Sequence, residues 1–116
     1  RKRVGRGLMR DARIEQPFGD GIYPFRLGYG QITELQEKCD CGPMRLLSRL
    51  QSGDWKIEDV FETVRIGLIG GGMEPKEALK LAGRYVKERP PLESHPLALA
   101  IVFAGLAGAP DETVGE

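Results

Sequence analysis

The segment Leu97–Ala107 contains only apolar residues and one glycine, and it constrains the fold of this chain more than any other stretch. A helix needs about 20 apolar residues to cross a bilayer, so this run is about half the required length and predicts no membrane span. We expect a helix here, with Ser94 as its N-cap and Pro96 in its first turn. Because it would be apolar on nearly every side, it should be central to the core or covered by a partner.

About four more helices are expected before this run, because apolar residues recur at helical spacing between glycine and proline breaks. The clearest begins near Asp54, where five apolar residues fall on one face, and Gly70-Gly71-Gly72 ends it. The acidic residues fall on the predicted solvent faces. The apolar faces predict a core made of Ile32, Leu35, Leu47, Leu50, Ile57, Val60, Phe61, Val64 and Leu68.

A hairpin is expected before the helices. Residues 13–18 and 22–27 alternate in part between apolar and polar, and Gly19-Asp20-Gly21 between them allows a tight turn. Pro17 and Pro24 cannot donate to a ladder, so both strands should be edge strands. Because a lone hairpin is unstable, it must lie on the helices. The sequence therefore predicts an α+β fold, an N-terminal β-hairpin followed by about five short helices in a small bundle.

The length of 116 residues fits one domain, which we place at residues 11–108. Residues 1–10 are expected to form a flexible basic arm, and residues 109–116 an acidic C-terminal tail. The arm carries Arg1, Lys2, Arg3 and Arg6, which could contact nucleic-acid phosphate, dock on a protein neighbour or remain solvated. Because the 17 basic and 17 acidic residues balance, nucleic acid is the least favoured of these partners.

No set of residues predicts an active site, so we expect a protein that is not an enzyme. The single histidine, His95, lacks an identifiable orienting partner and is interpreted as an exposed residue at a helix start. Cys39-Asp40-Cys41 has no second pair of metal ligands, which predicts one buried and one loop thiol. The glycines at 70–72 are not followed by the lysine of a phosphate loop. Catalytic, cofactor and metal sites are therefore all predicted to be absent.

The sequence also predicts a compartment. The basic start leads into Gly, Arg and Asp rather than an apolar segment, so no signal peptide is expected. Two cysteines are too few for a disulfide framework. These features favour the cytoplasm.

Several segments resemble a known family. One is the strand and turn into a helix at residues 25–36. Another is the helix that opens with Ile57-Glu58-Asp59-Val60 and closes at Gly70-Gly71-Gly72, which a helix containing Glu77-Ala78 follows. This order, over about residues 11–108, resembles the tail proteins of gene transfer agents and related tailed phages. The Cys-Asp-Cys and the long basic arm depart from the family pattern.

The resemblance implies a role in tail morphogenesis in a bacterial host and supplies no catalytic residues. Members have been described both as tail tube proteins and as assembly chaperones. We favour the chaperone, since one hairpin provides little β-structure for a tube. The resemblance implies other tail proteins as partners, including the tape-measure protein, and a homo-oligomer or incorporation into a phage-like particle is compatible with it. A small nucleic-acid-binding regulator that uses the basic arm is the alternative from another class. The candidate interface consists of the arm residues and Leu99, Phe103 and Leu106.

Overall fold

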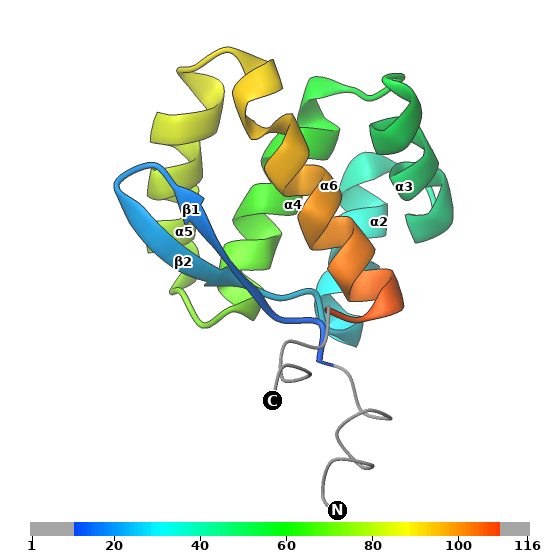
Figure 1. Cartoon of the computed structure of the whole chain (residues 1–116), viewed down its shortest axis with the longest axis horizontal. Coiled ribbons are helices and arrows are strands. Elements are labelled where there is room, and N and C mark those ends of the chain that lie inside the picture. The colour runs from blue at the N-terminus through cyan, green and yellow to red at the C-terminus, as the bar shows by residue number, and fades with distance from the viewer. Residues whose placement is uncertain (1–10, 110–116) are drawn as a thin grey trace, which may run out of the picture.

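The computed structural model describes residues 11–109. Strands β1 (Ile14–Phe18) and β2 (Gly21–Phe25) come first. The α-helices are α2 (Tyr29–Cys39), α3 (Pro43–Ser52), α4 (Ile57–Gly70), α5 (Pro75–Ala82) and α6 (Pro91–Ala107), and a π-helical segment, η1 (Gly83–Lys87), continues α5. The predicted α+β fold is confirmed, since a hairpin precedes five helices (Figure 1). The predicted arm and tail residues 110–116 lie outside the described residues.

The hairpin is antiparallel and turns through Gly19 and Asp20. Gly19 has a φ of +59°, which glycine adopts without steric cost. The ring of Tyr85 in η1 lies directly against Gly19, so that a Cβ at this position would overlap the ring. The Phe18 ring also meets Tyr85 edge-on, with 5.8 Å between the ring centroids. The hairpin therefore lies on the helices, and η1 holds its tip.

Both prolines of the hairpin occupy positions whose backbone groups face outward. A two-residue turn makes the flanking pair hydrogen-bonded, and the two kinds of pair then alternate along the strands. Pro17 lies opposite Ile22 and Pro24 opposite Glu15, which are the non-hydrogen-bonded pairs of this register. The backbone groups of such pairs point away from the partner strand. Each outer edge of the hairpin therefore lacks one backbone N–H that could donate to a neighbouring strand.

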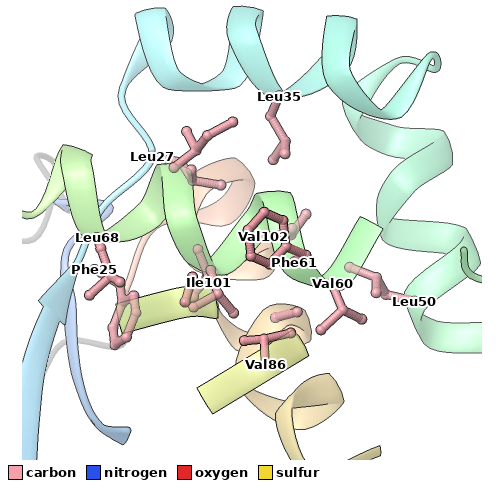
Figure 2. Close-up of a cluster of buried hydrophobic side chains, with 14 of the residues drawn as sticks. Phe25, Leu27, Leu35, Leu50, Val60, Phe61, Leu68, Val86, Ile101 and Val102 are labelled. Carbon is pink, nitrogen blue, oxygen red and sulfur yellow. The ribbon is translucent and has the colours of Figure 1, made fainter. Parts of the chain in front are cut away.

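Helix α4 is the centre of the molecule. Nearly every position from Asp59 to Leu68 is buried, because α2, α5, α6 and β2 all pack against this helix. Figure 2 shows side chains from several of the surrounding elements converging on α4, with Phe25 of β2, Leu35 of α2 and Ile101 of α6 among them. Among the predicted core residues, those that are buried are Leu35, Leu47, Leu50, Val60, Phe61, Val64 and Leu68. Ile32 is half-buried and packs against this core.

Ile57 does not belong to the core, and the prediction for it was wrong. Its side chain is 61% exposed. Ile57 is the first residue of α4, and side chains on a helix point toward its N-terminus, so Ile57 projects past the packed part of the helix. The expectation that acidic residues face solvent was wrong at the same place, because Asp59 is fully buried.

The last helix also begins earlier than predicted. It starts at Pro91 with Pro90 as its N-cap, and Ser94 is a buried residue inside the helix rather than its cap. Proline suits the first helical turn because its missing N–H would have had no helical partner there. Pro96 consequently lies inside the helix and not in its first turn. The extra turn adds Leu92 to the exposed surface of α6, where it is 72% exposed.

Candidate interaction surface

Helix α6 has one buried side and one apolar side that remains open. Ala98, Ile101, Val102 and Ala104 are buried against the rest of the fold. On the opposite side, Phe103 is 51% exposed and Pro96 is exposed, while Leu99 and Leu106 are half-buried. We call Leu92, Pro96, Leu99, Phe103 and Leu106 the α6 stripe. The stripe contains the three residues of α6 that the sequence predicted as a candidate interface.

Close contacts through small residues fix α6 in this position. A Cβ on Gly67 of α4 would lie 3.1 Å from Cγ2 of Ile101, and one on Gly105 would lie 2.9 Å from Cβ of Leu27. Glycine at these two positions lets α4 and the segment after β2 approach α6 closely. Figure 1 shows α6 lying across α4, with α3 on one side and β1 on the other. The buried side of α6 is therefore fixed against these elements, and the stripe faces outward.

His95 ties the start of α6 to α3, so the prediction of a solvent-exposed histidine was wrong. Its Nε2 lies 2.7 Å from the carbonyl oxygen of Leu50, and its ring stacks on Trp55 at 5.1 Å between centroids. Because a carbonyl oxygen only accepts, the proton must be on Nε2. His95 is half-buried by these contacts. The ring holds the start of α6 against α3.

A small groove adjoins the C-terminal end of the stripe. It lies between α2, α3 and α6, and its lining is apolar except for Gln36: Leu27, Ile32, Leu35, Gln36, Pro43, Leu46, Val102 and Leu106. The structure thus brings Ile32, predicted as core, beside Leu106, predicted as interface. The described chain ends meet near the end of α6, where the Ala109 N–H donates to the carbonyl oxygen of Asp11 at 2.7 Å. The predicted interface residues Arg1, Lys2, Arg3 and Arg6 lie outside the described residues.

A charge cluster around the fully buried Asp59 joins α2, α3 and α4. The Asp59 carboxylate accepts the backbone N–H of Lys56 at 2.8 Å and pairs with Arg49 at 3.3 Å. The side-chain ammonium of Lys56 donates to the carbonyl oxygen of Cys39 at 3.2 Å. Asp59 therefore caps α4 and neutralises a cation from α3 at once. The acid three residues after Lys56, at a helix start, was the sequence signal for this role.

Cys39 is held in an unreactive state beside this cluster. Burial, and next the negative charge of Asp59, raise the pKa of the Cys39 thiol to about 12. A thiol is a nucleophile and metal ligand only as the thiolate, so Cys39 is inert at neutral pH. Cys41 is half-buried and free. Within residues 11–109, no group of three or more His, Cys, Asp or Glu side chains is arranged to hold a metal ion.

The glycine run after α4 makes close backbone contacts. A Cβ on Gly70 would overlap the carbonyl oxygen of Arg26, and one on Gly71 would overlap that of Pro24. The Arg26 N–H donates to the carbonyl oxygen of Gly67 at 3.0 Å. The run ends α4, as predicted, and it also lets the helix end pack against β2. Sequence reasoning missed this second role, because the strand lies far away along the chain.

These features define a class of protein before any comparison. The described residues form a hairpin on a small helical bundle, their histidine and buried thiol are engaged in packing, and one helix exposes an apolar stripe. Such a surface is typical of proteins that act by contacting other proteins. No helix among the described residues is both long and apolar enough to reach across a membrane.

The comparison with protein families identifies the family. A family model described as phage tail tube protein, GTA-gp10, matches residues 11–108. The chain therefore belongs to this family of tail proteins from phages and gene transfer agents, and the resemblance noted in the sequence is confirmed. No match was found among curated proteins or among solved structures.

Proposed function

We propose that this protein is a tail assembly chaperone that acts through protein–protein contacts and has no catalytic activity. The observation that carries the proposal is the α6 stripe, because apolar side chains that line the outer face of one helix are suited to shielding apolar segments of another protein. Its partners are other tail proteins, with the tape-measure protein first among them. Its place of action is the cytoplasm of the bacterial host, before the tail tube polymerises.

The hairpin supports a chaperone over a tube subunit. Subunits of a β-tube join through continuous sheet, which requires free edges with outward donors and acceptors. Here the two strands have five residues each, and Pro17 and Pro24 remove one outward donor from each edge. The outward carbonyl oxygen of Pro24 lies against Gly71, so the end of α4 covers the β2 edge. This sheet is therefore poorly suited to extension by a neighbouring copy.

The second candidate is a structural component of the tail, which the description of the family favours directly. A structural subunit remains in the finished particle in many copies, whereas a chaperone leaves before completion. The two functions can be separated by mass spectrometry of purified particles from cells that express the protein. The chaperone predicts high abundance in the lysate and absence from particles, and abundant protein in the particles would favour the structural component.

Co-purification tests the chaperone directly. The full chain, tagged, is co-expressed with soluble fragments that tile the tape-measure protein encoded in the same gene cluster. We expect at least one apolar fragment to co-purify and to be more soluble with the protein than without it. If no fragment co-purifies while both proteins are soluble, the chaperone proposal is wrong.

A further inference from the structure

The α6 stripe has the spacing of a coiled-coil seam. Its five residues follow one another at intervals of four, three, four and three, which is the alternation of d and a positions in a heptad repeat. The seam faces outward, because the buried residues of α6 lie on the other side of the helix. A repeat of 3.5 residues keeps one line of side chains facing a parallel or antiparallel helix. The stripe therefore fits the side of one further helix.

The flanks of the stripe specify the chemistry of that helix. In a coiled coil, the positions beside the seam commonly carry charges that select the partner and its orientation. Here the flanking residues are Glu93, which pairs with Arg89, and His95, which is engaged with Leu50, followed by the apolar Ala100, Val102 and Ala107. A partner with charges at its own flanking positions would bury them against alanine without a counter-charge. The flanks therefore fit a helix that is uncharged along its contact face.

The size of the stripe indicates a reversible contact. Stable interfaces bury about 800 Å² on each partner. The stripe consists of five side chains, of which Leu99 and Leu106 are already half-buried. This is too little surface to hold a second copy of the chain as a permanent dimer. It suits a client helix that is bound and later released.

We propose that the α6 stripe binds one uncharged apolar helix of a client tail protein, side by side, in the packing of a two-helix coiled coil. This inference rests on the proposed chaperone function, for which it names the contact surface and the class of client segment. Phe103, the one aromatic side chain of the stripe and 51% exposed, is the expected anchor, since large aromatic side chains dominate the energetics of such contacts.

Synthetic peptides test the proposal without knowledge of the client. One labelled peptide of about three heptads carries Leu at a and d, with Ala and Gln at the flanking positions and charges only at the far side. A second peptide is identical except for Glu at the flanking positions. Binding of each to the full chain is measured by fluorescence anisotropy. We expect the uncharged peptide to bind and the Glu-flanked peptide to bind about tenfold more weakly.

Matched variants locate the contact. Phe103→Gln should weaken binding of the uncharged peptide by about tenfold or more. Leu79→Gln is the control, because Leu79 on α5 is 52% exposed, almost the same as the 51% of Phe103, and lies outside the stripe. It should change binding by less than about twofold. Leu92→Gln, at 72% exposure, repeats the test at a site where loss of folding is least expected.

Three results would overturn the proposal. Binding that survives both stripe variants would place the contact elsewhere. Equal binding of the two peptides would remove the assignment of an uncharged partner. Concentration-dependent dimerisation of the wild type in sedimentation, abolished by Phe103→Gln, would assign the stripe to a second copy. The chaperone function is tested separately. If a tape-measure fragment still co-purifies with Phe103→Gln, the chaperone function stands and the α6 stripe is not the binding surface. If the uncharged peptide binds the stripe but no tape-measure fragment co-purifies, the stripe binds a helix and the chaperone function is wrong.

Discussion

Gly70 and Gly71 matter because of the atoms they lack. The carbonyl oxygens of Arg26 and Pro24 occupy the space where a Cβ would stand on each. These oxygens belong to backbone, which cannot move aside as a flexible side chain can. The two glycines are therefore needed for the contact between the end of α4 and the hairpin.

Alanine at either position should destabilise the protein. We expect Gly70→Ala and Gly71→Ala to lower the free energy of unfolding by about 2–3 kcal/mol each, because the strand must shift away. Gly30→Ala in α2 is the control, since a Cβ there meets no atom within 4 Å. It should be neutral or stabilising by up to about 1 kcal/mol. Urea unfolding followed by fluorescence of the single tryptophan, Trp55, measures all three. Equal stability of the Gly71 and Gly30 variants would contradict the close approach.

The thiol of Cys39 gives the protein a pH dependence with a defined sign. Its pKa rises from 9.0 to about 12 on folding, so between these values the folded state binds more protons than the unfolded state. The stabilisation that Cys39 contributes is complete below pH 9 and is lost as the pH rises toward 12.

Comparison with Cys39→Ala isolates this effect from other titrating groups. Wild type should be the more stable protein at pH 8, because the alanine leaves unfilled space in the core. The difference in the free energy of unfolding between wild type and Cys39→Ala should decrease above pH 9, by up to about 1.4 kcal/mol per pH unit. Parallel stability profiles from pH 8 to 11 would show that the thiol does not titrate differently in the two states.

At the scale of elements, the buried cluster around Asp59 joins three helices, α2, α3 and α4. Asp59 belongs to α4, Arg49 to α3, and the carbonyl oxygen of Cys39 to the end of α2. Arg49 and the Lys56 side chain both donate to that carbonyl oxygen. The cluster satisfies the exposed backbone groups of two helix ends and fixes how α3 sits against α4.

Removal of the Asp59 carboxylate should therefore cost more than the loss of an ordinary helix cap. We expect Asp59→Ala to lower the free energy of unfolding by about 2–4 kcal/mol, since it leaves Arg49 and the Lys56 N–H without their acceptor. Asp59→Asn retains one acceptor and should cost less. Glu58→Ala, at the exposed neighbouring position in the same helical turn, should cost no more than about 1 kcal/mol. If Glu58→Ala and Asp59→Ala lowered the free energy of unfolding by similar amounts, Asp59 would act only through the favourable interaction of its charge with the helix dipole.

Most of the fold could be predicted because its signals are local. Pro43, Pro75 and the glycine run mark helix boundaries in the sequence itself, and the turn at Gly19 needs no distant partner to be recognised. The failures depend on contacts between distant segments. The burial of Asp59 and of His95 was decided by the helices that pack around them, whereas Ile57 is exposed because α4 begins at this residue.

The candidate surface was predicted in part for the same reason. The sequence predicted Leu99, Phe103 and Leu106 as interface residues, because the run Leu97–Ala107 is apolar on nearly every side. A helix that packs against a core on one side leaves the apolar residues of its other side exposed. Leu92 was missed because Ser94 is a good cap in isolation, whereas the chain uses Pro90 and Pro91 to start the helix one turn earlier. The spacing of the stripe could be recognised only after the helix start was known.

For the whole molecule, the open question is how a protein with an exposed apolar helix and a two-stranded sheet avoids assembly with itself. The end of α4 covers the β2 edge. On β1, Glu15 and Pro17 are exposed, although Pro17 borders a cleft that α6 lines from the other side with Ser94 and Leu97. An exposed strand edge with free donors is a template for pairing with another chain. Pro17, at an outward-facing position of this edge, removes the donor nearest the hairpin tip.

Pro17→Val should therefore promote association through β1. The substitution restores an outward N–H and raises β propensity, and an antiparallel pair of copies would gain two backbone hydrogen bonds. At about 1 kcal/mol net for each bond, the association constant should rise by about 30-fold.

Pro24→Val is the matched control, because the N–H it restores faces the end of α4 and cannot reach a second copy. Sedimentation velocity over a concentration series should show larger species for Pro17→Val alone. If Pro17→Val sediments as the wild type does, the proline is not what keeps this edge unpaired, and the argument against a sheet-forming tail subunit loses its strongest support.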